Sequence, residues 1–148
     1  MAKPVTPLLT VDCVVFDASD RVLLIRRGNP PFQGHYALPG GFVDVGETVE
    51  AACKRELLEE TGVKAGRLRL VGVYSAPDRD PRGHTVSVVF ATKVRSARPQ
   101  AGDDAAAAEW VERWQRQKLA FDHKIILRDA ARLMGVATGA SKATPAHT

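Results

Sequence analysis

The spacing of apolar residues along the chain predicts a series of strands. Four stretches are rich in β-branched or continuous apolar residues and are bounded by turn-forming residues, as buried strands are. These stretches are residues 8–16, 21–27, 68–74 and 85–94. Between the second and third of them, Asn29, Pro30 and Pro31 exclude regular structure over residues 28–34.

Two further stretches have the pattern of helices. The first follows Thr48, a good N-cap residue, and ends at Gly62, which can adopt the left-handed conformation of a helix stop. The second covers residues 122–134, with its first residue as the expected cap and Gly135 as its stop. Residues 105–112 fit either a helix or a strand. Strands interleaved with two helices predict an α/β (α+β) sandwich built on a mixed sheet.

Length and composition fit one globular domain. The chain has 148 residues, 45% of them hydrophobic, which is enough to bury about two thirds of its unfolded surface. We expect a single domain over residues 1–135 and, because residues 136–148 are small and polar without a pattern, a mobile tail after it. Cys13 and Cys53 are far apart in the sequence and fit no metal-ligand spacing. We interpret them as buried free thiols of a reducing cytosol.

Charge and hydropathy exclude several classes of protein. The net charge of +4 suits an anionic substrate, but the basic residues are scattered and lack the dense block typical of nucleic-acid binding. No run approaches the roughly 18 apolar residues of a membrane span, and the N-terminal apolar run is too short for a signal peptide. We therefore expect a cytoplasmic protein with a small-molecule partner, and we leave a homodimer open.

Carboxylates crowd at the end of the first predicted helix. Glu56, Glu59 and Glu60 fall within about one third of the helix circumference, where like charges repel. They occupy the last turns, where the helix dipole disfavours acids, and they lie on the side of an apolar stripe. A solvated acidic face explains neither feature. Clustered carboxylate oxygens are the ligands that Mg²⁺ and Mn²⁺ prefer, so the pattern indicates a divalent metal site.

The residues around this helix resemble the signature of a known family. Gly41, Glu47 and the run RELLEETGV at residues 55–63, separated by five and seven residues, match every defining position of the Nudix box. The preceding run HYALPGG is similar to the WxLPGG lead-in of that family, with Tyr36 where Trp is frequent. The resemblance implies a Nudix-type α/β/α sandwich with a mixed central sheet. It also implies metal-dependent hydrolysis of a nucleoside diphosphate linked to another moiety.

The resemblance implies roles for individual residues. The metal ligands would be the box glutamates and one backbone carbonyl, from Glu56, Glu59, Glu60 and Gly40. The default ion is Mg²⁺, with Mn²⁺ as its substitute. Arg55 would orient the acids rather than touch the substrate, and Glu47 would support them from outside the metal site.

The general base stays open between two groups of acids. One of the box glutamates, Glu56 or Glu59, could activate the attacking water. In several Nudix subfamilies an acid from a later loop has this role, and here the candidates are Asp103, Asp104 and Glu109. The glycine before them offers the mobility that a closing catalytic loop needs. A solvated acidic turn explains the same residues equally well.

The loop between the third and fourth predicted strands has a composition suited to a phosphorylated sugar. Its sequence, PDRDPRGH, offers Arg79 and Arg82 as bidentate phosphate donors and Asp80 as an acceptor for ribose hydroxyls. Pro77 lies fifteen residues beyond the last glycine of the box, close to a proline of the ADP-ribose pyrophosphatase subgroup that this chain resembles. His84 completes the predicted substrate-binding set, although a lone loop histidine is more often structural.

Three functions are compatible with these features. The preferred hypothesis is hydrolysis of ADP-ribose to AMP and ribose 5-phosphate. Clean-up of non-standard or oxidised nucleoside triphosphates uses the same box but needs a pocket that reads the base. A non-catalytic ADP-ribose-binding sensor would be typical of regulators with a degraded box, and the intact box argues against it. The FDHKIIL segment at residues 121–127 is also similar to the subgroup, and we interpret it as helix capping.

Overall fold

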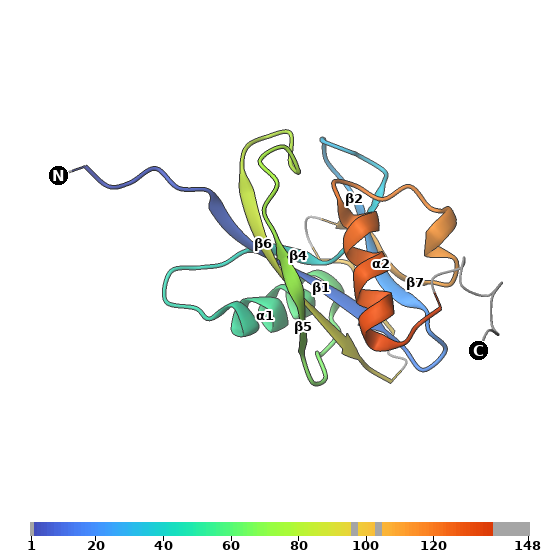
Figure 1. Ribbon diagram of the computed structural model, residues 1–148. Helices are drawn as coiled ribbons and strands as arrows, with labels where there is room; N and C mark the ends of the chain where they lie inside the picture. Colours follow the sequence, from blue (N-terminus) through green and yellow to red (C-terminus); the bar gives the residue numbers. More distant parts are fainter. Residues whose placement is uncertain (1, 96–97, 103–104, 138–148) are drawn as a thin grey trace, which may run out of the picture.

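The computed structural model describes residues 2–95, 98–102 and 105–137 (Figure 1). In chain order its elements are β1 (Leu8–Phe16), β2 (Val22–Arg27), β3 (Tyr36–Ala37), β4 (Gly40–Phe42), α1 (Val49–Thr61), β5 (Arg69–Tyr74), β6 (Thr85–Lys93), β7 (Ala105–Val111), the 3-10 helix η1 (Trp114–Arg116) and α2 (His123–Met134). The predicted strands and helices are all present, within one residue at most of their ends.

The strands form one mixed, seven-stranded sheet. Its main path has the order β3-β2-β1-β6-β5, while β4 pairs with β1 and β7 pairs with β2. The two long strands β1 and β6 run parallel along their whole length, and the remaining pairings are antiparallel. Residues 105–111 are a strand because they pair with β2, which overrides the helix propensity of their alanines.

The two helices cover opposite faces of this sheet (Figure 1). Successive residues of β1 point to opposite faces, because a strand has a period of two. Val11, Cys13 and Val15 pack in the cluster that contains Ala52 and Leu57 of α1. On the other face, β1 and α2 share a second cluster that contains Val14, Phe16, Ile126 and Leu127. The predicted sandwich of helix, sheet and helix is confirmed.

The start and the end of α1 are formed as the sequence predicts. The Thr48 hydroxyl accepts a hydrogen bond from the Ala51 amide at 3.1 Å, and Gly62 adopts a left-handed conformation with φ 72°. The backbone amide of Gly62 then donates to the Leu58 carbonyl. These caps fix where the acidic end of the helix stops relative to the sheet.

The prediction for the two cysteines was wrong. Cys13 of β1 and Cys53 of α1 are paired as a disulfide in the buried contact between helix and sheet. They are 40 positions apart in the sequence, and only the packing of α1 against β1 brings them together. Of the predicted tail, Val136 packs into the core on the α2 side, and residues 138–148 lie outside the described residues.

Among the described residues, no helix combines the length and the apolar character that a membrane crossing requires.

Candidate active site

Arg55 gathers the carboxylates of α1 and its preceding loop around one guanidinium group. Its Nε and Nη2 donate to the two carboxylate oxygens of Glu47 at 2.6 and 2.9 Å. Its Nη1 donates to Glu56 at 2.8 Å and to Glu59 at 3.1 Å, and Nη2 also donates to the Phe42 carbonyl. The hydrogen bond from Arg55 lowers the pKa of Glu47 to about 2. This arrangement is the one expected of an arginine that orients the acids.

Glu56 lies against the backbone of the glycine-rich lead-in. A Cβ added at Gly41 would meet the carboxyl group of Glu56 at 2.5 Å, so a larger residue there would displace this acid from its present position. Burial raises the pKa of Glu56, Arg55 opposes that shift, and the charge of Glu59 adds to it. A carboxyl group with a raised pKa holds a proton more readily near neutral pH, which suits proton transfer.

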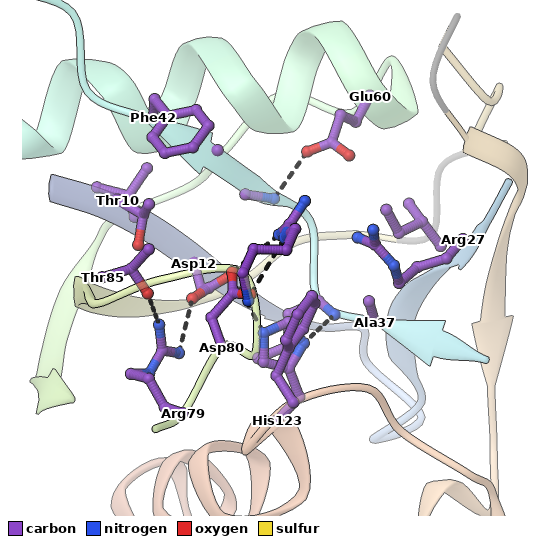
Figure 2. A pocket seen from close by; sticks show the side chains of 17 residues that line it. Thr10, Asp12, Arg27, Ala37, Phe42, Glu60, Arg79, Asp80, Thr85 and His123 are labelled. Atoms are coloured by element: carbon purple, nitrogen blue, oxygen red, sulfur yellow. Dashed lines mark hydrogen bonds and ion pairs between the residues drawn. The ribbon is translucent and has the colours of Figure 1, made fainter. Parts of the chain in front are cut away.

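Glu60 connects the end of α1 to strand β4. Its carboxylate accepts a hydrogen bond from the Gly40 amide at 2.7 Å (Figure 2). A Cβ at Gly40 would collide with the Val11 carbonyl and with the side chain of Asp12. Gly40 is therefore needed for the close approach to β1, while Gly41 leaves Glu56 in its present position.

Two adjoining cavities lie beside these carboxylates. The larger is an open cleft of about 780 Å³ whose lining includes Glu56, Glu59 and Glu60. The smaller, of about 120 Å³, has polar side chains along much of its wall. We call it the inner pocket (Figure 2). The lining residues that both cavities share are Ile25, Arg27, Gly40, Gly41, Phe42, Glu60 and Arg82.

Arg79 lies buried at the wall of the inner pocket. Its side chain is 5% exposed, and its Nε and Nη2 donate to the two carboxylate oxygens of Asp122 at 2.9 and 2.8 Å. Its Nη1 donates to the Thr85 hydroxyl at 2.8 Å. This bidentate pair fixes the loop before β6 to the start of α2. It also uses the edge of the guanidinium that a phosphate would take. The predicted contact of Arg79 with substrate stays a prediction.

The interpretation of the FDHKIIL segment as helix capping was wrong. Asp122 stands at the N-cap position of α2, but its side chain makes no capping bond and accepts from Arg79 instead. The residues on either side of it, Phe121 and His123, both line the inner pocket. The segment therefore contributes pocket wall, which its position at the start of a helix concealed.

The other three predicted substrate-binding residues lie in different surroundings. Asp80 and Arg82 line the inner pocket and are paired, with Arg82 Nη2 donating to Asp80 at 2.9 Å. Burial opposes ionisation of Asp80, but the hydrogen bonds from Arg82 hold its pKa below the ordinary value. His84 contacts the Ser75 carbonyl through Nε2 at 3.0 Å and lines a separate groove beside residues 5–8. A role of His84 in binding stays a prediction.

Comparison with known proteins identifies the family. The NUDIX domain family matches residues 6–130. The chain belongs to the NUDIX family. An ADP-ribose pyrophosphatase from Methanocaldococcus jannaschii is 50% identical over 126 residues, which are 85% of this chain and 74% of that protein. The chain spans 53–63% of the length of several further curated relatives that it matches.

Solved structures with the same fold include two with bound nucleotides. The NUDIX domain of Shewanella oneidensis NrtR complexed with ADP ribose has a TM-score of 0.82 and 31% identity, covering 87% of this chain and 89% of that one. A bifunctional NMN adenylyltransferase/ADP ribose pyrophosphatase from Francisella tularensis, complexed with AMP and a manganese ion, has a TM-score of 0.73 and 28% identity. The superposition covers 85% of this chain and 41% of that one.

The carboxylates of this NUDIX domain have suitable chemistry for a divalent ion but are not gathered into a ligand cluster. In the described part of the chain, no group of three or more His, Cys, Asp or Glu residues is arranged to hold a metal. Arg55 joins Glu56 to Glu59, and Glu60 is bonded to Gly40. All three nevertheless line one cleft, and their hard oxygen donors fit Mg²⁺ or Mn²⁺. Their role as ligands, with the Gly40 carbonyl, stays a prediction.

The geometry does not show which acid outside the box, if any, acts as the general base. Asp103 and Asp104 lie outside the described residues. Glu109 accepts a hydrogen bond from the Tyr36 hydroxyl at 2.7 Å and lies 3.7 Å from the Arg26 guanidinium. Neither cavity at the carboxylates includes Glu109 in its lining. The choice between Glu56 or Glu59 of the NUDIX box and an acid of the later loop stays a prediction.

Sequence reasoning missed Asp12, a buried carboxylate in the wall of the inner pocket. Asp12 accepts a hydrogen bond from the Ser87 hydroxyl at 2.5 Å. A carboxylate oxygen of Asp12 also lies 3.6 Å from His123 Nε2. His123 Nδ1 accepts from the Leu38 amide at 3.0 Å. A carboxylate in the middle of an otherwise apolar strand was the available signal, because charges are buried only when they have partners.

We expect His123 to make stability depend on pH. Burial lowers the pKa of this imidazole, outweighing the charge of Asp12, so protonation favours the unfolded chain. Stability is thus fully present above the unfolded pKa of about 6.5 and is lost as the pH falls below it.

His123→Asn keeps an acceptor for Leu38 and does not titrate. Between pH 7 and 5, urea unfolding should show a steeper loss for the wild type, by at most about 1.4 kcal/mol per pH unit. If the free energies of unfolding of the wild type and His123→Asn changed equally with pH, this role of His123 would be contradicted.

Proposed function

We propose that this chain is a metal-dependent hydrolase that converts ADP-ribose to AMP and ribose 5-phosphate. The observation that carries the proposal is a small pocket with several carboxylate, hydroxyl and guanidinium groups in its wall, joined to the cleft that the box carboxylates line. ADP-ribose has two sugar-containing halves joined by a diphosphate. A site with adjoining compartments suits such a substrate, with the diphosphate beside the carboxylates.

The identity to an ADP-ribose pyrophosphatase over most of the chain supports this choice of substrate. The NUDIX domain complexed with ADP ribose supports it as well, at 31% identity. Within the inner pocket, Asp12 and Asp80 offer carboxylate oxygens, and Thr10 and Thr85 offer hydroxyl groups. Such groups bind sugar hydroxyls, so we assign the terminal ribose to this pocket.

Different residues would bind the metal and orient the acids. Glu56, Glu59 and Glu60, with the Gly40 carbonyl, would hold Mg²⁺ or Mn²⁺. When bound, the metal would neutralise phosphate charge and lower the pKa of a water molecule. Arg55 keeps the acids oriented through the hydrogen bonds described above.

The reaction adds one water across the diphosphate. The water oxygen bonds to one phosphorus atom, the bridging P–O bond breaks, and the bridging oxygen leaves with the other phosphate. A box glutamate, Glu56 or Glu59, or one of Asp103 and Asp104 would accept the proton of the water. Expulsion of bulk water by the bound substrate would strengthen these charge interactions.

The test is a substrate panel with identification of both products by mass. Wild-type protein with Mg²⁺ or Mn²⁺ is given ADP-ribose, 8-oxo-dGTP and ATP. We expect AMP and ribose 5-phosphate from ADP-ribose, at a kcat/KM at least about tenfold above that for the triphosphates, because the inner pocket is polar and small. In ¹⁸O-labelled water, one of the two products should carry a single label.

Other outcomes of the same panel separate the alternatives. A preference for the triphosphates would favour the clean-up hydrolase. Binding of ADP-ribose without release of AMP would favour a sensor, as in a domain that holds its ligand intact. The proposed location in the cytoplasm and the option of a homodimer are independent of this assay.

A further inference from the structure

Two arginines from distant parts of the chain meet over one aromatic ring. Arg27 ends strand β2, and Arg82 belongs to the loop before β6. The guanidinium carbons of Arg27 and Arg82 lie 5.0 and 5.5 Å from the centroid of the Phe121 ring. Such distances allow cation–π attraction, which holds both cations near the same ring although they repel each other.

The backbone at this ring is unusual. Phe121 has φ 54°, a left-handed conformation that residues other than glycine adopt rarely. The ring also packs edge-on against Phe32, with centroids 5.0 Å apart. Strained residues of this kind persist where the surrounding structure fixes them, and they cluster at functional sites.

The two arginines differ in their hydrogen-bond partners: Arg82 has a carboxylate and Arg27 a neutral carbonyl. Asp80 compensates Arg82 through two side-chain hydrogen bonds of 3.1 and 2.9 Å. Arg27 is held in place because its Nε donates to the Pro31 carbonyl at 2.6 Å, a neutral partner. Burial and the charge of Arg82 both lower the pKa of Arg27, while Asp80 and Glu60 raise it. Two guanidinium groups beside one ring both attract an anion that lies within reach of each.

The position of the pair in the site indicates which anion this is. Arg27 and Arg82 both line the cleft of the box carboxylates and the inner pocket, so they stand where the two cavities meet. Figure 2 shows the Arg27 side chain reaching from β2 toward the middle of the inner pocket. A linker that crosses from one cavity to the other passes through the region that these residues line.

We infer that Arg27 and Arg82, held by Phe121, form a two-arginine clamp for the diphosphate that joins the two halves of the substrate. This inference rests on the proposed function. Asp80 takes one N–H each from Nε and Nη2 of Arg82, and the Pro31 carbonyl takes Nε of Arg27. Each arginine can therefore offer the Nη1–Nη2 end of its guanidinium to phosphate oxygens, and two of them can hold adjacent phosphates. The clamp thereby distinguishes a diphosphate linker from a single phosphate and positions the linker at the acids of α1.

Replacing Arg27 by Gln tests the clamp. We expect the KM for ADP-ribose to rise about 10- to 100-fold with kcat changed less than about threefold, because a charge-assisted bond formed in both ground and transition states is lost. In calorimetric titrations with Mg²⁺, binding of α,β-methylene-ADP should weaken at least about tenfold, and binding of AMP less than about threefold. Arg82→Gln should reproduce this pattern.

Arg26→Gln is the matched control. Arg26 is the neighbouring residue on β2 and also stacks on an aromatic ring, that of Tyr36 at 4.2 Å, but it lines neither cavity. It should leave both affinities within about twofold of wild type. Equal losses for AMP and α,β-methylene-ADP in Arg27→Gln, or no difference from Arg26→Gln, would overturn the clamp.

Two further measurements keep the test decisive. Thermal melting shows whether Arg27→Gln is folded. If it is not, Arg27→Lys, which keeps the charge and loses the fork, should bind α,β-methylene-ADP more weakly than wild type. Wild-type affinity in this variant would overturn bidentate binding. If wild-type protein binds α,β-methylene-ADP through the arginines but does not hydrolyse ADP-ribose, the proposed activity fails and the clamp stands.

Discussion

Replacing Glu60 by Gln is expected to lower kcat for ADP-ribose by about 10²- to 10⁴-fold while the protein stays folded. The proposed metal site loses a charged ligand, and such a loss costs roughly 3–5 kcal/mol of transition-state stabilisation. The Gln side-chain oxygen can still accept the hydrogen bond that Glu60 takes from the Gly40 amide at 2.7 Å. Initial rates at a series of Mg²⁺ concentrations, together with thermal melting, measure both parts of this prediction.

Glu50→Gln is the control for this experiment. Glu50 lies in the first turn of the same helix, is exposed and is part of neither cavity. The change removes the same charge from α1 and should alter kcat by less than about twofold. Wild-type turnover in Glu60→Gln at saturating Mg²⁺ would show that this carboxylate is not a ligand.

Replacing Arg79 by Met is expected to lower the free energy of unfolding by about 3–5 kcal/mol. The side chain is 5% exposed and neutralises Asp122, with Asp12 at 3.8 Å. Removing the guanidinium leaves these carboxylates without their cation in a buried site, and a methionine cannot replace its hydrogen bonds. For a domain of this size the loss corresponds to a decrease in Tm of roughly 10–15 °C. Urea unfolding followed by circular dichroism gives the free energy directly.

Two variants separate the buried ion pair from a general effect of losing an arginine. Arg132→Met removes an exposed arginine from α2 and should change the free energy of unfolding by less than about 0.5 kcal/mol. Asp122→Asn in the Arg79→Met background removes one of the orphaned charges and should recover part of the stability. A loss for Arg79→Met no larger than that for Arg132→Met would refute the structural role of the pair.

Local signals were enough to predict strands β1, β2, β5 and β6 and both helices. Strands β1 and β6 are runs of β-branched residues, and their burial on both faces of the sheet explains why those runs are continuous. Thr48 and Gly62 mark the ends of α1 because capping depends on residues within a few positions. Residues 105–111 had to be placed by pairing with β2, which composition does not encode.

The candidate site was predictable to the extent that one helix contains it. Arg55, Glu56, Glu59 and Glu60 fall within six consecutive helical residues, so helical geometry alone places them on neighbouring positions of one helix. The loop arginines could not be assigned in the same way. Arg79 and Arg82 are neighbours in the sequence, yet one is buried against Asp122 and the other lies over Phe121. Their surroundings depend on a segment 40 residues later.

The sequence by itself determined strands β1, β2, β5 and β6, the two helices, the family and the acidic end of α1, because each depends on residues close together in the chain. The tertiary structure alone decided the pairing of Cys13 with Cys53, the buried contacts of Arg79 and the meeting of Arg27 with Arg82 over Phe121. These contacts join strands, a loop and a helix start that are distant in sequence. Only the packing of both helices on one sheet sets the distances between them.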